Sequence, residues 1–399
     1  MTASPAHLRA WWWHRQGLDG PLAGAAPAAV LARSGWARSV GGAGPYLTLW
    51  ARAGTRRADA DAAVAALAVH ELPAARGCTY VLPAEDYALA LALARTAPAT
   101  DMAAARALGV TDAEVDALAD RVVDALAGGA LDPDGIRAAV GGAARSLGEA
   151  GKKKGVGTTL PLALGRLQAA GRIRRVPADG RLDRQRYRYA RWDDAPAWDD
   201  ARPPHEALAE RFFRCNGPAT LGEWQWYAGL GVRAARAAAE PLGLVPAWPG
   251  ADRLLLPGDA DAFRAFAAPA EPRYAFLSGL DALFAARREL ATLLDPADAE
   301  RPARTATRPR TLGSLQDLPS HAVVDRGRLV GLWEYDAEAG ELVWATFDGR
   351  HDAAALRDAA DRAAAYVTDD LGDARAFSLD SPASRRSRLD ALRRAVTAW

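Results

Sequence analysis

The chain has 399 residues, of which 50% are hydrophobic and 25% are charged, and its formal net charge of +1 by itself argues against a nucleic-acid partner. This length predicts roughly two to four domains. No run approaches the ~18 consecutive apolar residues of a membrane span, and the N-terminus has no signal-peptide pattern, so we expect a cytoplasmic protein that does not contact membranes. Two cysteines, Cys78 and Cys215, are too few for a disulfide framework or a zinc cluster, and we interpret both as small buried residues.

Residues 1–100 predict a mostly helical, winged-helix-like domain with one short strand. Apolar periodicity indicates the helices, and the run Gly77–Leu82, closed by Pro83, indicates the strand. The predicted helices are Leu8–Trp13 (ending before Gly17), a short one after Pro27, Tyr46–Arg52, Asp59–Val69 and Glu85–Thr96. Gly41–Gly44 lacks the Lys and Thr of a phosphate-binding loop, so we expect it to permit close packing or a tight turn.

Residues 101–198 predict a winged helix, in which two strands joined by a loop follow a helix–turn–helix. Thr111 and Glu114 form the S/T-x-x-E pattern of a helix start, and Asp132-Pro133 starts a second helix. The segments that follow are a Gly- and Lys-rich turn (Lys152–Thr159), a helix (Leu160–Ala170), a strand (Arg172–Val176), a loop with Asp179-Gly180 at its tip (Pro177–Arg184) and a returning strand (Gln185–Trp192). In this order the helix 160–170 is the expected recognition helix and the loop 177–184 is the expected wing.

The same order recurs at residues 199–262, after an acidic, Pro-rich linker, and predicts a second winged helix. Its predicted helices are His205–Cys215, Thr220–Tyr227 and Val232–Leu242, and its strands are Leu244–Trp248 and Arg253–Leu256. Residues 263–399 predict a final domain with a helix at Asp281–Leu294, a β-meander of His321–Asp325, Leu329–Tyr335 and Glu341–Phe347, a helix at 352–368 and a strand near Ala376–Leu379. The predicted fold class is therefore α+β, with tandem winged-helix domains and a C-terminal β-rich domain.

Positive charge is concentrated in one segment. Residues 151–192 contain twelve basic residues and two acids, a local charge of +10, which leaves −9 for the rest of the chain. A charge run is ordinarily a solvated face, but these cations fall on the turn, the recognition helix and the wing, so we predict binding of double-stranded DNA. The predicted DNA-binding residues are Lys152, Lys153, Lys154, Thr158, Thr159, Arg166, Arg172, Arg174, Arg175, Arg181, Arg184 and Arg186. The pattern leaves open whether Tyr187 and Tyr189, which alternate with arginines, stack on bases or pack in the core.

Known catalytic motifs are missing from the sequence. The six histidines lack metal-ligand spacing, and there is no P-loop, no G-x-G-x-x-G after a strand and no G-x-S-x-G, so we expect no metal and no cofactor. His14 and Gln16 follow three tryptophans on the first helix; they belong to a base pocket or, as we favour, to the polar face of a helix with a Trp core stripe. His70-Glu71 is better explained as a helix end than as a reactive pair.

Several segments, in order along most of the chain, resemble one family. Arg76–Asp86 (RGCTYVLPAED) resembles the family segment RGT-x-H-x-x-P-x-E-D, and Val324–Trp333 (VDRGRLVGLW) resembles its segment V-D-G-R-V-V-G-x-W. Asn216–Thr220, with Glu223-Trp224 and Gly229-Leu230, resembles its segment GPAT…W-S-G-L. Gly155–Gly171 resembles its central winged helix. The chain thus resembles the winged-helix DNA glycosylases that unhook interstrand crosslinks, the AlkZ and YcaQ type.

This resemblance implies a concave DNA-binding face built by tandem winged helices, and metal-free cleavage of the N-glycosidic bond of alkylated or crosslinked bases. In the family the reaction depends on a Gln-x-Gln or Gln-x-Asp motif before a Y-L-x-L-W-x-R helix, where polar groups position water and stabilise the cationic sugar. The helix is present here as Tyr46–Arg52, but the motif positions fall on Arg38-Ser39-Val40, and Tyr80 replaces the histidine of RGT-x-H.

Two hypotheses follow from the resemblance. In the first, the protein is a glycosylase-like protein that binds duplex DNA, and its candidate catalytic groups are Gln16, His14, Arg38 and Tyr80. In the second, it is a non-catalytic winged-helix regulator or a sensor of damaged DNA. The missing pair of glutamines favours the second hypothesis for the chemistry, while both predict DNA binding.

Overall fold

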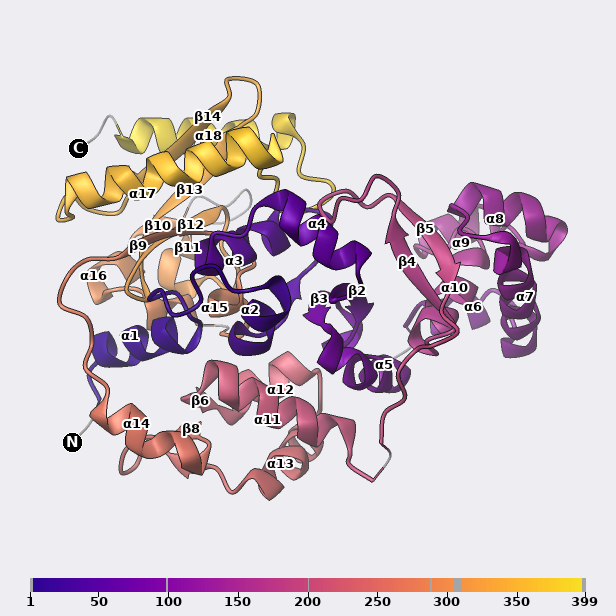
Figure 1. The fold of residues 1–399 in the computed structure, drawn as a ribbon, viewed down its shortest axis with the longest axis horizontal. Coiled ribbons are helices and arrows are strands. Elements are labelled where there is room, and N and C mark those ends of the chain that lie inside the picture. Colours follow the sequence, from indigo (N-terminus) through magenta and orange to yellow (C-terminus); the bar gives the residue numbers. More distant parts are fainter. Residues whose placement is uncertain (1–2, 98–99, 200, 288, 304–309, 397–399) are drawn as a thin grey trace.

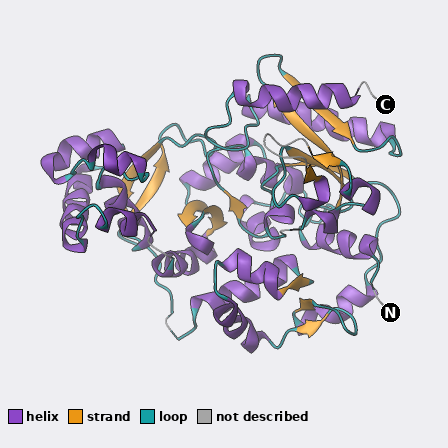
Figure 2. Cartoon of the chain, turned by 180° about the vertical axis from the view of Figure 1, so that it is seen from behind, coloured by secondary structure: helices purple, strands orange, loops and turns teal. Residues whose placement is uncertain are grey.

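The computed structural model describes residues 3–97, 100–199, 201–287, 289–303 and 310–396. Three consecutive stretches share one arrangement, in which one or more helices, a short strand or an isolated bridge, further helices and two more strands follow one another. We name them the first unit (residues 27–83), the basic unit (100–192) and the third unit (204–256). The basic unit projects from the rest of the molecule, on the side away from both termini (Figure 1). Helices dominate all three, with small strand pairs between them (Figure 2).

The first unit follows the N-terminal helix α1 (Pro5–Arg15). Its elements are α2 (Pro27–Ser34), β1 (Ala37–Arg38), α3 (Gly44–Ala53), α4 (Arg57–Ala65), β2 (Val69–Pro73) and β3 (Thr79–Pro83), and α5 (Tyr87–Thr96) comes next. The strands are antiparallel in the order β1-β3-β2. The prediction of one helix over Asp59–Val69 was wrong at its end, because Leu67 adopts a φ of 54° and Val69 starts β2. His70 and Glu71 therefore lie on a strand rather than at a helix end.

The basic unit confirms the predicted order of helices and strands. Its elements are α6 (Thr100–Arg106), α7 (Asp112–Ala125), α8 (Pro133–Val140), α9 (Gly148–Lys153), α10 (Leu160–Ala169), β4 (Ile173–Pro177) and β5 (Tyr187–Arg191). Leu131 pairs with Tyr189 of β5, so the order Leu131-β5-β4 matches the sheet of the first unit. Thr111 caps α7 by accepting a hydrogen bond from the Glu114 N–H, as its pattern predicted, and Asp132 caps α8. The Lys-rich turn differs from the prediction, since α9 includes its first two residues, Lys152 and Lys153.

The third unit repeats this topology. Its elements are α11 (Pro204–Asn216), β6 (Ala219–Thr220), α12 (Leu221–Ala228), α13 (Val232–Ala239), β7 (Val245–Pro246) and β8 (Arg253–Leu255), with the sheet order β6-β8-β7. Thr220 and Glu223 form a complete capping box, because each side chain accepts a hydrogen bond from the other residue's backbone N–H. The predicted helix over 232–242 ends earlier, where Glu240–Leu242 tighten into a 3-10 turn.

The C-terminal part contains the predicted meander within a four-stranded antiparallel sheet of order β14-β13-β12-β9. Its elements are α14 (Ala260–Ala265), β9 (Tyr274–Leu277), α15 (Ala282–Ala285), α16 (Pro296–Ala299), β10 (Pro302–Ala303), β11 (Arg310–Thr311), β12 (His321–Asp325), β13 (Arg328–Asp336), β14 (Glu341–Thr346), α17 (Ala353–Tyr366) and α18 (Pro382–Val396). The mixture of helices and small antiparallel sheets confirms the α+β class.

Three details of this part differ from the sequence prediction. Residues 281–294 form α15 and a separate 3-10 turn, Leu290–Leu293, instead of one helix. Residues 376–379 form a loop, since the backbone bond from Ser378 N–H to the Val40 carbonyl is not continued into a strand ladder. Helix α18 follows this loop, and β9 adds an edge strand to the sheet; neither element was predicted.

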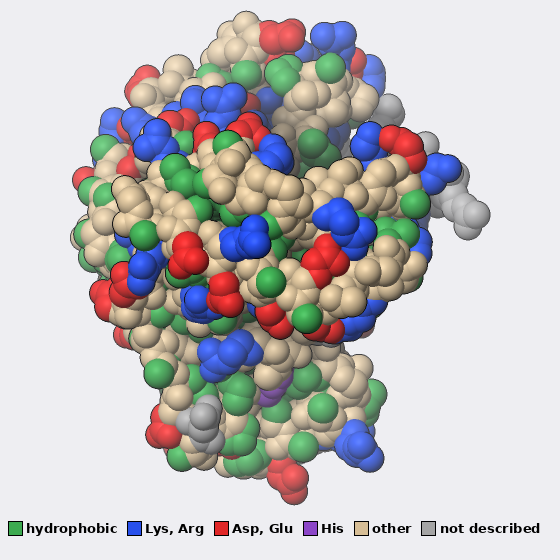
Figure 3. Space-filling model, turned by 90° about the vertical axis from the view of Figure 1, so that its right-hand side faces the viewer, with side chains coloured by type: hydrophobic (Ala, Val, Ile, Leu, Met, Phe, Trp, Pro, Cys, Tyr) green, Lys and Arg blue, Asp and Glu red, His purple; other side chains and the backbone are tan. Residues whose placement is uncertain are grey.

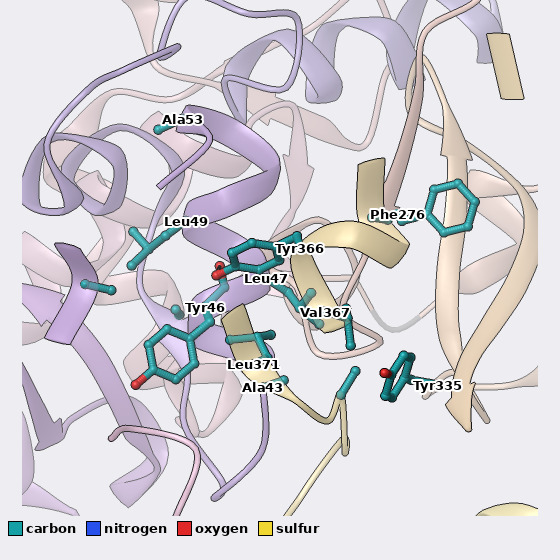
Figure 4. Packing of buried hydrophobic residues seen from close by; sticks show 14 of the residues in the cluster. Ala43, Tyr46, Leu47, Leu49, Ala53, Phe276, Tyr335, Tyr366, Val367 and Leu371 are labelled. Atoms are coloured by element: carbon teal, nitrogen blue, oxygen red, sulfur yellow. Dashed lines mark hydrogen bonds between the residues drawn. The ribbon is translucent and has the colours of Figure 1, made fainter. Parts of the chain in front are cut away.

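Buried clusters show how the parts are joined. One cluster packs α3 of the first unit against α17 and the four-stranded sheet, with Tyr46 and Leu47 beside Tyr366 and Val367 (Figure 4). Trp50 stacks on Tyr366, with 4.9 Å between ring centroids. A second cluster joins β2, β3 and α5 to the third unit, whereas the basic unit has a core of its own. The first unit is thus the centre of the molecule, and the basic unit is an appendage with a separate core.

The tryptophan run of α1 is part of the core, as the predicted Trp stripe requires. Trp11 and Trp12 donate indole hydrogen bonds to the Gly217 carbonyl (3.0 Å) and the Pro218 carbonyl (3.1 Å) at the end of α11. The Arg287 guanidinium lies 3.9 Å from the Trp12 ring centroid. Among the described helices, none combines the length and the apolar character that crossing a membrane requires.

Candidate nucleic-acid interface

Half of the twelve cations in residues 151–192 are paired with carboxylates. The pairs are Lys152–Glu149, Arg166–Asp112 and –Asp116, Arg172–Asp120, Arg181–Asp183, Arg184–Asp179, and Arg191–Asp193. Helix α7 supplies three of these carboxylates and lies outside the segment counted from the sequence. The local charge of +10 therefore overstates the positive charge of the folded surface. Lys and Arg side chains alternate with Asp and Glu side chains over this face of the molecule (Figure 3).

The other six cations have no carboxylate within ion-pair distance in the described part of the chain. They are Lys153 and Lys154 at the end of α9, Arg174 and Arg175 on β4, and Arg186 and Arg188 at the start of β5, and all but the β4 pair are exposed. Exposed ion pairs contribute only ~0–1 kcal/mol, so Lys152, Arg172 and Arg184 can exchange their carboxylates for phosphates at little cost. The surface that suits phosphate binding is thus narrower than the sequence predicted.

Helix α10, the expected recognition helix, offers few polar side chains to a groove. Its leucines are buried in the core of the basic unit, and the helix also packs against α5 of the body. Its exposed positions, Pro161 and Gly165, carry no hydrogen-bonding group. Its polar side chains are engaged as well, since Arg166 pairs with two carboxylates of α7 and Gln168 donates to the Leu164 carbonyl. Arg166 is therefore the polar side chain of α10 that stays partly exposed.

The loop of residues 178–186, which contains most of the expected wing of residues 177–184, is anchored to the body. Leu182 is fully buried in the cluster that contains Tyr46, and its N–H donates to the Tyr46 hydroxyl at 2.8 Å. Arg181 pairs with Asp183 and donates to the Leu371 carbonyl at 2.9 Å. These contacts hold Arg181 in the interface between the basic unit and the body, which makes it a poor phosphate contact. Arg184 and Arg186, at the end of this loop, remain exposed.

The two threonines of the Lys-rich turn have different surroundings. Thr159 is fully buried, and its hydroxyl accepts a hydrogen bond from the Arg145 N–H at 3.0 Å, so it stabilises the fold instead of meeting a ligand. Thr158 is half-buried and lies next to the exposed Gly155 and Lys154. Only Thr158 of this pair keeps the accessibility that a phosphate contact needs.

Arg38 and Tyr80 lie together on neighbouring strands. They are direct partners in the β1–β3 register, and the Arg38 guanidinium lies 5.3 Å from the Tyr80 ring centroid and donates to the Thr79 carbonyl at 3.2 Å. Burial raises the pKa of the Tyr80 phenol to about 12, although Arg38 opposes the shift, so this side chain stays protonated at neutral pH. The pair presents a cation over an aromatic ring.

Ser39, between the two outer motif positions, belongs to a buried polar cluster that the sequence did not reveal. Its hydroxyl donates to the Glu71 carboxylate, and burial raises the pKa of Glu71, while the bond from Ser39 and the nearby charge of Arg175 partly offset that rise. The preceding residue on β2, His70, has both ring nitrogens buried without a hydrogen-bond partner among the described residues, and burial lowers its pKa to about 3. The helix assigned to residues 59–69 concealed this cluster, because only a strand turns Glu71 and His70 to opposite faces.

Gln16 and His14 lie in a different part of the structure from Arg38 and Tyr80. Gln16 is fully buried, donates to the Cys215 carbonyl at 2.9 Å and accepts from Arg52 at 3.0 Å. Arg52 in turn forms a buried pair with both oxygens of Asp281 at 2.8 Å. His14, at the edge of α1, lies 2.6 Å from the Asp19 carboxylate. The structure thus gives Gln16 a packing role and does not bring the four predicted catalytic candidates together.

The glycine-rich loop allows the close packing that its sequence predicted. Gly41 has a φ of +76°, and a Cβ atom there would meet the Gln185 side chain. A Cβ atom on Gly42 would collide with the Ala376 carbonyl. The loop thereby carries both the end of the anchored loop 178–186 and the segment before α18 against the motif positions.

An open groove of ≈ 780 Å³ is lined by residues of α10, of α5 and of the β2–β3 strands. Its walls combine apolar side chains such as Met102 and Leu160 with arginines, among them Arg95 and Arg175. The Nε atom of Arg175 is buried without a hydrogen-bond partner in the described part of the chain, and its guanidinium lies 4.9 Å from the Tyr187 ring centroid. Tyr189, on the same strand as Tyr187, packs in the core of the basic unit. The described residues contain no group of three or more His, Cys, Asp or Glu side chains placed to hold a metal ion.

Comparison with known proteins agrees with this architecture. A model of the AlkZ-like DNA glycosylase family matches residues 37–366. The chain belongs to the AlkZ-like DNA glycosylase family. The solved structure of Streptomyces sahachiroi DNA glycosylase AlkZ is similar with a TM-score of 0.70 and 21% identity, over 92% of this chain and 98% of that chain, which shows a shared fold. No curated protein sequence matches the chain.

Membership in the AlkZ-like family assigns the protein to the glycosylase-like proteins of DNA repair, with DNA as the class of partner. The AlkZ-like match begins at β1 and ends with α17. The match therefore includes the four-stranded sheet and the three units, except for α2, the first helix of the first unit. The helices α1 and α18, and the loop of residues 372–381 before α18, lie outside it.

Proposed function

We propose that this AlkZ-like protein binds duplex DNA through its three units, which we interpret as tandem winged helices, and that it acts in the cytoplasm. The topology supports the interpretation, because each unit has helices on both sides of a short strand or bridge and then two strands, the last of which pairs with that first strand or bridge, as in a winged helix. The observation that carries DNA binding is the group of exposed cations without carboxylate partners in the described chain, Lys153, Lys154, Arg186 and Arg188. Such cations bind phosphates and release counterions.

The proposed contacts are a subset of those predicted from the sequence. They are Lys152, Lys153, Lys154, Thr158, Arg172, Arg184 and Arg186, with Arg188 added. Arg166, Arg174, Arg175 and Arg181 are half-buried, and Thr159 is buried. Binding through cations of the turn and of the strand pair, with α10 turned inward, predicts weak sequence specificity, because phosphates carry no base identity.

An amine-specific experiment tests this proposal, because Lys152, Lys153 and Lys154 are the only lysines in the chain. Acetylation with an amine-reactive ester removes three positive charges at one place and leaves every arginine intact. We expect acetylation to weaken binding to a duplex, and bound duplex to protect the three lysines from the reagent. The matched control is the Lys152→Arg/Lys153→Arg/Lys154→Arg variant, which keeps the charges and does not react at these positions. If the same treatment weakens DNA binding by this variant equally, the loss is due to acetylation of the N-terminal amine. If the acetylated wild-type protein binds DNA as before, the proposal is overturned.

We further propose that the protein recognises damaged DNA without excising a base by the Gln-x-Gln chemistry. The support is the group at the motif positions, which is a cation, a buried serine and an apolar side chain at Arg38, Ser39 and Val40. The sugar becomes positively charged as the base leaves, and a guanidinium beside it raises the energy of that transition state. Neither Arg38 nor Val40 accepts a hydrogen bond from an attacking water.

A glycosylase assay on alkylated and crosslinked duplexes tests this second statement. We expect no abasic product from the wild-type protein, whereas binding to the same duplexes is retained. Base excision by other groups is the alternative function, which membership in the AlkZ-like family favours. Abasic product from the wild-type protein would establish that alternative. The Arg38→Gln/Val40→Gln variant then shows whether the two glutamine amides alone supply the missing chemistry.

A further inference from the structure

Two large apolar side chains point into solvent from the loop before α18. Phe377 is 43% exposed and Leu379 is 82% exposed, and among the described residues the other large hydrophobic side chain left exposed in this way is Val232, on α13. Exposed apolar area of this kind is unfavourable in water and commonly marks a binding surface. The loop lies outside the segment that matches the model of the AlkZ-like family.

Hydrogen bonds hold the loop in one conformation. The Ser378 N–H donates to the Val40 carbonyl at 3.0 Å, and the Ala43 N–H donates to the Arg375 carbonyl at 2.9 Å. Within the loop, the buried Asp380 carboxylate accepts from the Ala376 N–H at 3.0 Å, and α18 pairs with the same carboxylate through Arg388 at 2.7 Å. Phe377 and Leu379 therefore project from a fixed base, and ordering the loop on binding costs little entropy.

Positive charge flanks this apolar pair. A Cβ atom on Gly41 would meet the side chains of both Gln185 and Ser378, which places the two segments side by side across the glycine loop. Gln185 is exposed between Arg184 and Arg186, which are exposed as well. The half-buried Val40 extends the apolar surface toward the glycine loop. An apolar pair beside two arginines matches a partner that offers stacked aromatic rings next to phosphates.

We propose that Phe377 and Leu379 form a wedge that inserts between the base pairs of bound duplex DNA, with Arg184 and Arg186 on the adjacent phosphates. Apolar side chains inserted at a base step unstack it and kink the duplex, and the phosphate contacts offset the cost of unstacking. An abasic site or a bulge lowers that cost, so the wedge gives the protein a preference for damaged duplexes. This inference rests on the proposed DNA binding and extends it to a means of recognising damage.

Two measurements on one pair of variants test the wedge. The first is the fluorescence of 2-aminopurine in a duplex, which increases when the base is unstacked. The second is the ratio of the dissociation constants for an intact duplex and for the same duplex with an abasic site. We expect the wild-type protein to increase the fluorescence and to prefer the abasic duplex. We expect Phe377→Ala/Leu379→Ala to lose both effects and to bind the abasic duplex about 5- to 100-fold more weakly, by analogy with losses on removing stacked aromatic groups.

Matched controls separate the wedge from DNA binding in general. Val232→Ala removes an exposed apolar side chain elsewhere and should change neither readout, and Phe377→Trp should retain both. The salt dependence of binding should stay the same in the double alanine variant, because no cation is removed. If that variant still increases the fluorescence and prefers the abasic duplex, the wedge is wrong while DNA binding stands. If the variant changes only the oligomeric state, the pair is a self-association surface and the wedge is also wrong. Failure of the wild-type protein to bind any duplex would overturn the proposed function and the wedge together.

Discussion

Replacing Lys152, Lys153 and Lys154 by alanine should reduce the salt dependence of DNA binding by an amount that the structure sets. Lys153 and Lys154 have no carboxylate within ion-pair distance in the described chain, so each releases a full complement of counterions on meeting a phosphate. Lys152 lies 2.6 Å from Glu149, but the two side chains are 68% and 78% exposed, so this pair is weak and contributes part of a third contact. The tract thus accounts for two to three phosphate contacts.

Each phosphate contact contributes about 0.9 to the slope of log Kobs against log salt concentration, so the triple variant should lose about 2 to 3 units of slope. Between about 50 and 200 mM salt, the wild-type affinity should then fall about 10- to 60-fold more than that of the variant. Fluorescence anisotropy with a labelled duplex at several salt concentrations measures both slopes. Arg264→Ala is the matched control, because Arg264 is 68% exposed and paired with Asp261 on α14, away from the basic unit. An unchanged slope in the triple variant would refute the assignment of the lysine tract as a phosphate site.

Three further predictions concern stability and use urea unfolding. Burial lowers the pKa of His70 to about 3 from the 6.5 expected in the unfolded chain. Below pH 6.5 the unfolded state binds a proton that the folded state does not, so the free energy of unfolding falls by about 1.4 kcal/mol per pH unit as the pH is lowered from 6.5. His70→Phe should remove this dependence on pH, and the same dependence in the wild-type protein and the variant would contradict the reasoning. Leu182→Ala should cost about 2–5 kcal/mol by leaving a cavity where the basic unit is anchored, and a loss under 1 kcal/mol would mean that the loop is not held there. Asp281→Ala should cost about 3–5 kcal/mol by leaving Arg52 buried without its carboxylate, whereas Arg52→Met/Asp281→Leu should recover much of that loss; no recovery would show that the pair itself stabilises the fold.

Local patterns predicted the helices well where the start signals were strong. Thr111 and Asp132 cap their helices as their positions in the sequence indicate, because a cap depends on residues within one helical turn. The meander at residues 321–347 was also visible, since its strands are apolar and follow one another through short turns. The segment of residues 57–73 failed for the opposite reason. Its alanines favour a helix, but β2 is needed to complete a sheet with β3, and that partner is not local.

The candidate site divides in the same way. The concentration of Lys and Arg in residues 151–192 and the replacement of glutamines at Arg38 and Val40 are properties of the sequence. Pairing with α7 is not, because the carboxylates of Asp112, Asp116 and Asp120 come from a helix more than thirty residues away along the chain. A count of charge along the sequence includes neighbours in the chain and omits neighbours in space.

The sequence by itself determined that the chain contains winged-helix-like patterns, a family-specific order of segments and a cation where the family has a glutamine. Only the tertiary structure decided which of these features a partner can reach. Leu182 and the leucines of α10 are apolar side chains that any core accepts. Leu182 is buried against the body, which anchors the expected wing, and the leucines of α10 are buried in the core of the basic unit. Phe377 and Leu379 are apolar as well, yet the hydrogen bonds of their loop keep them exposed. The hydrophobic effect acts on all of these residues alike, and the packing of distant segments determines which of them it can bury.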